Sequence, residues 1–293
     1  MDDRRIGLIA GWGDFPVTVA RQLVDDGKQV HALGFHGHAD PRLQEICHKF
    51  QWTGLTRAGS QVRFFQRHGV RQATMAGKLF KTILFERFAW LRHLPDTTFL
   101  RFFYPHFITR TANRNDDAML LTFVRLFETY GIRLLPATDF APELLVKKGT
   151  LTQRPLTEYQ MRDVQFAWGL AKQMGQLDIG QSVAVKGRAV LAVEAVEGTD
   201  ECIRRAGQLC PSGGFTVVKV AKPEQDMRFD VPTVGIGTLQ TMRAARGSVL
   251  AIEADRTIVL GQQDLISYAN RNQITVVALS QADLESPVVR RAA

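Results

Sequence analysis

The order of apolar and polar residues along the first half of the chain predicts strands that alternate with helices. Short apolar runs with the length of buried strands occupy residues 5–10, 29–34, 72–76 and 132–135. Helix signals occupy residues 16–26, 57–68 and 116–130, and the last of these has apolar residues at helical spacing. Because such alternation favours parallel pairing, the pattern predicts a Rossmann-like domain with a mainly parallel sheet over residues 1–140.

The pattern weakens and then resumes, which predicts a second α/β domain. Residues 141–156 are rich in proline, glycine and threonine and are expected to form a linker. A catalytic domain is expected over residues 157–280, followed by a flexible tail at 281–293. Within it, Thr199 or Asp200 is expected to cap a helix. Residues 249–252 and 257–260 are expected to pair as a hairpin.

Composition places the chain among soluble globular proteins, with 45% hydrophobic and 23% charged residues. Three cysteines without CxxC spacing, a polar start and no apolar run of ~20 residues predict a cytoplasmic protein. The net charge of +8 either favours an anionic partner (nucleic acid, anionic lipid or a phosphorylated substrate) or reflects only a solvated basic surface. Basic residues are not concentrated in one recognition helix, so we expect no nucleic-acid partner.

The segment 222–235 has an unusual density of charge between two prolines, directly after an apolar strand. It contains three carboxylates, Glu224, Asp226 and Asp230, and the two cations Lys222 and Arg228. Converging carboxylates can hold a hard divalent metal, and cations beside them can hold a phosphate. This combination is what phosphoryl chemistry requires, because its transition state is stabilised mainly by charge and position.

A glycine-containing turn, Gly11-Trp12-Gly13, separates the first strand from the first helix. Backbone N–H groups and a helix N-terminus at such a turn favour an anion. Pro16 stands where the third glycine of a dinucleotide fingerprint would be, which argues against NAD and leaves a nucleotide, a phosphate or a plain tight turn. Lys78, after the third strand, is either a ligand-crevice residue or an ordinary surface lysine.

Two further segments have both a structural and a functional interpretation. Asp116 and Asp117 begin the strongest helix and suit its dipole, and the preceding Arg114 could contact a phosphate. Aromatic residues interleaved with basic ones fill residues 79–108 and either cover the sheet or form an apolar chamber or membrane-facing patch. His36 and His38 lack further ligands at zinc-like spacing, so no zinc site is expected there.

Six segments resemble those of the UDP-2,3-diacylglucosamine pyrophosphatases of the LpxI type, which act in lipid A synthesis. The segments are residues 6–11, 77–79, 115–121, 151–152, 194–200 and, above all, 222–235. The resemblance extends over residues 5–280. It implies two α/β domains joined by a linker with the substrate between them. It also implies Mg²⁺-dependent hydrolysis, with Mn²⁺ as an alternative metal, to UMP and 2,3-diacylglucosamine 1-phosphate (lipid X).

The same resemblance implies roles for particular residues. An essential aspartate of the family corresponds to Asp230, with Asp226 as its companion metal ligand and Glu197 or Asp200 as a further one. The implied catalytic residues are Asp230, Asp226, Lys222 and Arg228. The implied substrate-binding residues are Gly11, Trp12, Gly13, Lys78, Arg114, Asp116, Asp117, Glu197, Thr199 and Thr233. Trp12 replaces the middle one of three glycines usual in the family, and it either stacks on uracil or marks altered binding.

The resemblance also implies partners, and alternatives stay open beside it. A lipid substrate implies peripheral contact with the inner membrane surface, residues 79–108 are implied to hold acyl chains, and a homodimer is one option for the oligomeric state. A different nucleotide-sugar pyrophosphatase or transferase is the alternative enzyme. The alternative outside catalysis is a lipid- or nucleotide-binding protein.

Overall fold

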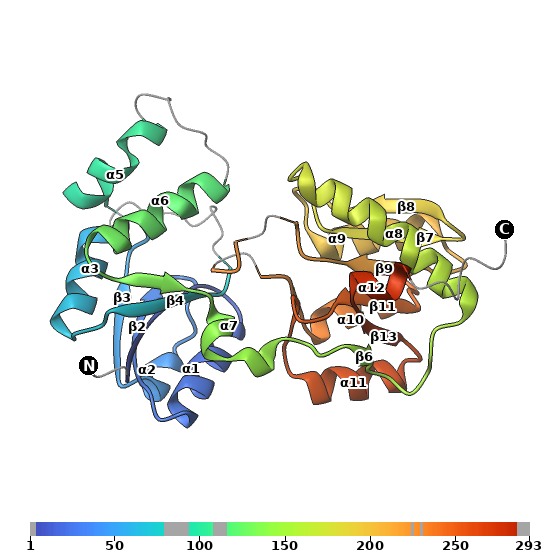
Figure 1. Ribbon diagram of the computed structural model, residues 1–293, viewed down its shortest axis with the longest axis horizontal. Helices are drawn as coiled ribbons and strands as arrows, with labels where there is room; N and C mark the ends of the chain where they lie inside the picture. Colours follow the sequence, from blue (N-terminus) through green and yellow to red (C-terminus); the bar gives the residue numbers. More distant parts are fainter. Residues whose placement is uncertain (1–3, 79–93, 108–115, 224–225, 229–230, 286–293) are drawn as a thin grey trace. The chain divides into compact units, whose positions relative to one another are not determined.

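The computed structural model describes residues 4–78, 94–107, 116–223, 226–228 and 231–285. The chain divides into two compact units (Figure 1). The first comprises Met1–Pro142 with Met227–Phe229, and the second comprises Glu143–Asp226 with Asp230–Ala293. The division after Pro142 falls at the start of the linker expected at 141–156.

The first unit is built on a five-stranded sheet in the order β3-β2-β1-β4-β5. Its strands are β1 (Arg5–Ala10), β2 (Gln29–Phe35), β3 (Lys49–Thr53), β4 (Gln72–Ala76) and β5 (Arg133–Leu135). Every neighbouring pair is parallel. The apolar run of β1 is buried from Ile6 to Ala10, as a strand covered on both faces must be. The expected α/β class with a mainly parallel first sheet is confirmed.

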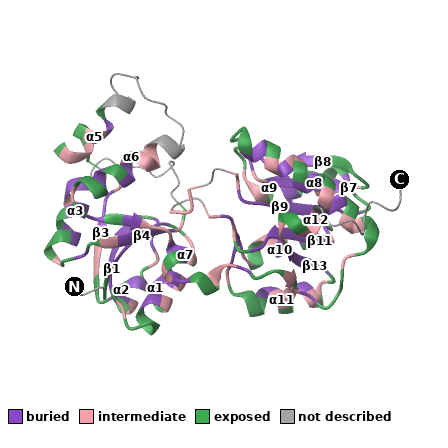
Figure 2. Cartoon of the chain, in the orientation of Figure 1, coloured by how far each residue is buried: buried purple, intermediate pink, exposed green. Residues whose placement is uncertain are grey.

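Helices cover both faces of this sheet (Figure 1). One face carries α1 (Phe15–Asp25), α2 (Leu43–Ile46) and α7 (Ala137–Phe140), which contact one another around α1. The other carries α3 (Ala58–Arg67), α5 (Thr97–Phe107) and α6 (Asp116–Thr129). Figure 2 shows the buried residues concentrated on the strands and the inner helix faces. Phe65, Phe103 and Phe127 are buried in the core beneath α3, α5 and α6.

The second unit has a six-stranded mixed sheet in the order β6-β13-β11-β9-β7-β8. Its strands are β6 (Gly149–Thr150), β7 (Ser182–Lys186), β8 (Ala189–Val193), β9 (Thr216–Lys219), β11 (Val249–Glu253) and β13 (Thr275–Leu279). The central three, β9, β11 and β13, are parallel, and the outer strands are antiparallel. A separate parallel pair joins β10 (Thr233–Val234) to β12 (Ile258–Val259).

Helices also cover both faces of the second sheet (Figure 1). One side carries α8 (Glu158–Gln176), which Trp168 and Gln165 connect to α12 (Gln281–Glu285) by hydrogen bonds to Gln281 and Leu284. The other carries α9 (Thr199–Leu209), α10 (Ile236–Ala244) and α11 (Gln262–Arg271). A capping box between Thr157 and Gln160 begins α8.

Two local expectations, the hairpin and the cap of α9, were wrong, and the structure adds detail to the expected linker and tail. The hairpin does not form, because β11 belongs to the large sheet and β12 pairs with β10. The expected linker contributes β6, which pairs with β13. The expected flexible tail begins with α12, and residues 286–293 lie outside the described part. Neither Thr199 nor Asp200 caps α9, since Gly198 is the N-cap and has no side chain to accept a hydrogen bond.

Of the helices in the described ranges, none combines the length and the apolar character needed to cross a membrane.

The buried side chain of His31 makes the first unit sensitive to acid. It lies on β2 and is only 3% exposed, and neither of its ring nitrogens has a hydrogen-bond partner among the described residues. The rings of His68 and His48 lie 5.1 and 5.5 Å from it. Burial, and then the neighbouring positive charges, lower the pKa of His31 from 6.5 to about 4.

Acidification should therefore destabilise the protein through His31. The unfolded chain takes up a proton near pH 6.5 and the folded chain only near pH 4, so stability falls as the pH drops through this window. Between pH 7 and pH 5 we expect a loss of about 2 kcal/mol that His31→Leu lacks. Urea denaturation of the parent and of His31→Leu at the two pH values measures this loss in the free energy of unfolding. Equal losses in the two proteins would show that His31 is not the source of the acid sensitivity.

Candidate functional site

The turns after β1 and β4 hold each other through their backbones. Trp12 N donates to the Lys78 carbonyl at 2.8 Å, and Lys78 N donates to the Trp12 carbonyl at 3.0 Å. Gly11 N also donates to the Ala76 carbonyl at 2.8 Å. The predicted residues Gly11, Trp12, Gly13 and Lys78 thus lie together at the carboxyl edge of the parallel sheet, where α/β proteins bind ligands.

Glycine is required on both sides of this pairing. A Cβ on Gly11 would lie 2.6 Å from the Lys78 carbonyl oxygen. Gly77 has a φ of +92°, and a Cβ there would lie 2.8 Å from the carbonyl carbon of Gly11. The turn therefore brings two main chains closer than any side chain permits.

The two cations near these turns, Arg42 and Lys78, differ in whether their charge is paired with an acid. Asp14, at the start of α1, pairs with Arg42 at 2.7 Å, and Arg42 also binds Asp40 at 2.7 Å. Hydrogen bonds from Arg42 lower the pKa of Asp40, so Asp40 stays ionised. Arg42 is thus balanced by two acids, whereas no described residue accepts a hydrogen bond from the exposed Lys78 side chain. Trp12 is half-exposed beside it.

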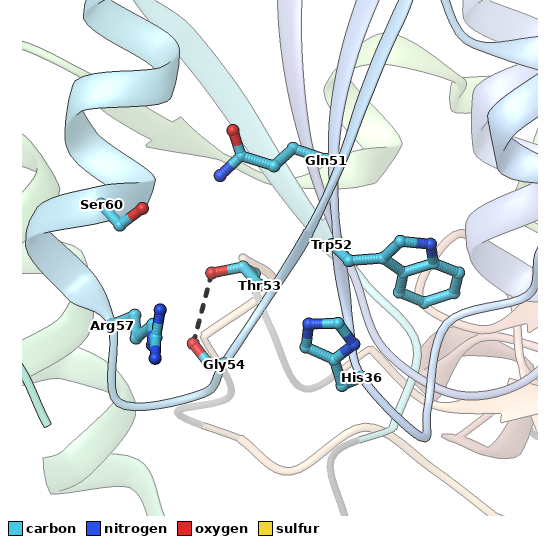
Figure 3. A pocket seen from close by; sticks show the side chains of 7 residues that line it. All are labelled: His36, Gln51, Trp52, Thr53, Gly54, Arg57 and Ser60. Atoms are coloured by element: carbon cyan, nitrogen blue, oxygen red, sulfur yellow. Dashed lines mark hydrogen bonds between the residues drawn. The ribbon is translucent and has the colours of Figure 1, made fainter. Parts of the chain in front are cut away.

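A pocket of about 290 Å³ opens further along the same edge (Figure 3). The strands contribute His36, directly after β2, and Gln51, Trp52 and Thr53 at the end of β3. Gly54 follows β3, and α3 contributes its N-cap Arg57 and Ser60. Sequence reasoning missed this pocket because it did not predict β3, whose five residues interrupt their apolar pattern with Lys49 and Gln51.

In the second unit, a buried polar network forms beneath the charged segment. Thr199 Oγ1 donates to Glu194 Oε1 at 2.9 Å and accepts from Lys219 Nζ at 3.1 Å. Lys219 Nζ also donates to the Thr233 carbonyl at 3.2 Å. Lys219 and Glu194 are each 8% exposed. Because Lys219 ends β9 and Thr233 begins β10, this lysine joins the two ends of the charged segment.

A second contact fixes the start of that segment. Lys172 on α8 donates to both Glu253 carboxylate oxygens, at 2.7 and 2.9 Å, and to the Ala221 carbonyl at 2.9 Å. Ala221 N donates to Glu253 Oε2 at 2.8 Å. The sequence analysis did not identify these anchoring residues, which are Lys219, Glu194, Lys172 and Glu253. The one signal for them in the sequence was Lys219, a lysine at the end of an apolar strand.

The predicted cations of the charged segment are engaged in ion pairs. Lys222 pairs with Asp178 at 2.6 Å, and Arg228 pairs with Glu128 of α6 at 3.5 Å, within the first unit. Asp226 is half-buried. Asp230 lies outside the described residues, as does Arg114.

The remaining predicted residues are distributed over both units. Thr199 and Thr233 meet at Lys219, whereas Glu197 pairs with Arg205. Asp116 and Asp117 begin α6, but their side chains are outside the described set. Asp200 lies in the first turn of α9.

The aromatic segment at 79–108 lies partly outside the described ranges. In its described part, Phe99 stacks on Phe103 at 4.3 Å, and Phe103 is buried in the core. Leu100 and Tyr104, four residues apart on α5, are half-exposed. These core contacts agree with the structural interpretation for Phe103, and the acyl-chain role of the segment stays a prediction.

Within the part of the chain that the structure describes, no group of three or more His, Cys, Asp or Glu side chains is placed to hold a metal ion. The three cysteines are free and buried, and burial raises the pKa of Cys47 and Cys202 to about 12. Nucleophilic catalysis by these two thiols is therefore disfavoured.

Replacing Gly77 should separate the two turns. Gly77→Ala forces a left-handed backbone onto alanine and pushes its Cβ into Gly11, so we expect a loss of more than about 3 kcal/mol in the first unit. Gly131→Ala is the matched control, because Gly131 has a similar φ of +79° and open space around it, and should cost about 1 kcal/mol. Denaturant-dependent hydrogen exchange of peptides from β1 and β4 measures the loss of stability in both variants. Equal costs would show that the close approach is unimportant.

Replacing Lys219 should destabilise the second unit. Lys219→Met leaves Glu194 buried without its cationic neighbour and the Thr233 carbonyl without its donor, for a cost of roughly 2–3 kcal/mol. Lys147→Met removes an exposed pair with Asp255 and should cost under about 1 kcal/mol. Adding Glu194→Gln to Lys219→Met should recover part of the loss. Hydrogen exchange in β9 and β11 measures the free energy of opening in the two single variants and the double variant. Costs that simply add would show that Lys219 and Glu194 are not energetically coupled.

Comparison with known proteins covers nearly the whole chain. The LpxI N-terminal domain model matches residues 5–144, and the LpxI C-terminal domain model matches residues 147–277. The UDP-2,3-diacylglucosamine pyrophosphatase LpxI of Caulobacter vibrioides is 30% identical over 276 residues, which are 91% of this chain and 94% of that protein. The two models meet close to Pro142, where the structure itself divides. Since both halves match in order and the relative aligns almost from end to end, the chain belongs to the LpxI family.

Proposed function

We propose that this protein hydrolyses the pyrophosphate bond of UDP-2,3-diacylglucosamine to give UMP and lipid X, as a step of lipid A biosynthesis. The observation that carries the proposal is the near full-length similarity to a relative named for that substrate. Water is the second reactant, so one P–O bond of the pyrophosphate breaks and one P–O bond to water forms. The products are two phosphate monoesters.

The first unit supports the proposal through its carboxyl edge. The paired turns present the start of α1 and the side chain of Lys78 at the point where β1 and β4 diverge to their connections. A phosphate is favoured by a helix N-terminus and by a cation such as Lys78, which has no side-chain partner among the described residues. Lys78 would offset negative charge on the substrate, and Gly13, which has open space around it, leaves room for a ligand beside the turn.

The second unit supports it through the anchoring of the charged segment. Lys219 joins the two ends of this segment, and Glu253 with Lys172 fixes Ala221 at its start. Side chains on a segment anchored in this way lose less entropy when they bind substrate. Thr199 and Thr233 contact Lys219, and Glu197 precedes α9 and pairs with Arg205 of that helix; all three are proposed to position the substrate.

Lys222 and Arg228 are proposed to stabilise the charge that builds up on the pyrophosphate. Both now pair with partly exposed acids, Asp178 and Glu128. Because the acid of each pair is partly exposed, at 49% for Asp178 and 45% for Glu128, a dianionic substrate could take its place.

Asp226 and Asp230 would hold Mg²⁺, or Mn²⁺ in its place. The donor chemistry fits, because hard divalent cations prefer carboxylate oxygens, and Asp226 is the member of the pair that the structure describes. A bound divalent ion would supply charge compensation and lower the pKa of a bound water. The lipid substrate places the enzyme, as proposed, in the cytoplasm at the inner membrane surface, and a homodimer stays a prediction.

Removing the proposed metal ligands should abolish turnover. With UDP-2,3-diacylglucosamine and Mg²⁺, the parent should release UMP and lipid X, identified by mass spectrometry, and EDTA should stop the reaction. Asp230→Asn and Asp226→Asn should each lower kcat by roughly 100-fold or more. Asp255→Asn is the matched control, because Asp255 is an exposed acid of the same unit with a left-handed φ of 56° that asparagine accepts.

The products of this assay distinguish a hydrolase from a transferase and from a binding protein. Transfer of an intact group to an acceptor would indicate a transferase. Retention of uncleaved substrate by the parent would indicate a binding protein. Activity of Asp230→Asn near that of Asp255→Asn would remove Asp230 from the reaction.

A further inference from the structure

The side of α8 turned away from the sheet exposes large apolar side chains to solvent (Figure 2). Tyr159 is 56% exposed, Phe166 is 43% exposed, and Leu177, which follows the last turn, is 71% exposed. At about 100° per residue, these three positions lie within about 20° of one another around the helix axis. Large apolar residues aligned on one exposed face indicate a contact with another molecule.

Gly169, on the same side of α8, gives an independent sign of such a contact. It is exposed near the middle of the helix, where glycine is destabilising relative to alanine, and a Cβ there would have no atom within 4 Å. The other glycine of α8, Gly175, differs, because a Cβ there would lie 3.2 Å from the Lys222 Cα. Packing among the described residues therefore accounts for Gly175 and leaves Gly169 unexplained.

Two copies of α8 placed antiparallel match each other along this side. A two-fold axis midway between Phe166 and Gly169 brings Phe166 of one copy over Gly169 of the other. The same axis brings Arg162 opposite Gln173, because the two pairs share one midpoint along the helix. A large ring thus meets a position without a side chain, and a guanidinium meets a carboxamide oxygen that can accept its hydrogen bonds.

The ends of the helix continue this match. About the same axis, Tyr159 of one copy lies opposite Leu177 of the other to within one residue, so two highly exposed apolar side chains cover each other. Tyr159 is already held in place, because a Cβ on Gly187 would lie 2.5 Å from its hydroxyl oxygen. A side chain that is ordered beforehand loses less entropy when the two copies associate.

The outer face of α8 is defined here by the residues on this side, which are Glu158, Tyr159, Arg162, Phe166, Gly169, Gln173 and Leu177. It has one anion and one cation, so it is neutral although the chain carries a net charge of +8. Two copies can approach through such a face without like-charge repulsion. An anionic bilayer instead attracts faces that are rich in lysine and arginine, so the charge of this face favours a second copy.

We propose that the outer face of α8 is the interface of a homodimer, with a two-fold axis between Phe166 and Gly169. This inference goes beyond the proposed function and does not depend on it, because it uses no residue of the charged segment or of the glycine turn. A single pair of 19-residue helices, each about 28 Å long, forms a small interface, so we expect a dimer that dissociates at micromolar concentrations.

Sedimentation of the full-length protein over a range of concentrations tests this interface. The parent should reach twice the 32.8 kDa mass of one chain. Phe166→Glu should raise the Kd of the dimer roughly 30-fold or more, because it places a carboxylate at the centre of the contact. Leu209→Glu is the matched control, since Leu209 is a 66% exposed helical residue of the same unit outside this face, and this variant should dimerise like the parent.

Gly169→Gln separates dimerisation from the stability of the single chain. In the monomer the new side chain enters open space and improves the helix, so thermal unfolding of dilute protein should shift to a higher temperature. In the dimer the same side chain occupies the space of Phe166 from the other copy, so the Kd should rise roughly 10-fold. A more stable chain that dimerises as well as the parent would contradict the proposed contact.

A charge introduced at Gln173 tests the register of the two helices. Gln173→Glu should lower the Kd of the dimer roughly 3-fold through an ion pair with Arg162 of the other copy, and adding Arg162→Gln should remove this gain. Within one helix these positions are about 16 Å apart, so their coupling must arise between copies. A gain that persists without Arg162 would overturn the register.

Three results would overturn the interface as a whole. The first is a parent that stays monomeric at every concentration, and the second is a dimer that Phe166→Glu leaves intact. The third is a monomeric parent that binds vesicles of phosphatidylglycerol and phosphatidylcholine, with binding lost in Phe166→Glu, because the face would then contact a membrane. None of these measurements involves turnover, so a failure of the proposed function would leave them valid.

Discussion

Parallel strand pairing is the constraint on which the rest of this structure depends. Because parallel strands place their carboxyl ends at one edge, segments far apart in sequence meet there. In the first unit the edge gathers the glycine turn after β1, His36 after β2 and Lys78 after β4. In the second unit the parallel strands β9 and β11 end at Lys219 and Glu253. The residues that we connect with function therefore lie where topology, rather than local sequence, has placed them.

Burial separates the cations of the molecule into two kinds. Lys219 and Lys172 are engaged by buried or nearly buried groups and hold the backbone on either side of the charged segment. A buried charge without its partner is costly, so these lysines are committed to structure. Lys78 and Arg57 are exposed and hold no partner among the residues described, and they can bind a ligand without first breaking an internal bond. Lys222 and Arg228 are intermediate, since each is mostly buried and pairs with a partly exposed acid.

The sequence predicts well those elements whose own residues carry a clear apolar pattern. The apolar runs of β1, β2 and β4 and the periodicity of α6 suffice to indicate an α/β unit. β3 escaped prediction because polar residues break its apolar pattern, and the pocket at its end was missed with it. The hairpin was wrong because β12 pairs with β10, a contact between segments that proximity in sequence does not favour. The role of Lys219 was equally out of reach, since its burial depends on Thr199, twenty residues earlier.

The two units differ in the charge that they can offer a phosphorylated substrate, and under the proposed function this difference would assign substrate recognition to the first unit and the reaction to the acids of the second. At the described edge of the first unit, Arg42 balances Asp14 and Asp40, so an anion there meets Lys78 and Arg57 with little opposing charge. The carboxylates proposed for metal binding belong instead to the segment anchored in the second unit. If carboxylates and phosphate-binding groups shared one rigid surface, the acids would repel the substrate in the absence of metal. Under the proposed function, the nucleotide would bind to the first unit, and the acids of the second unit would act only on the pyrophosphate bond.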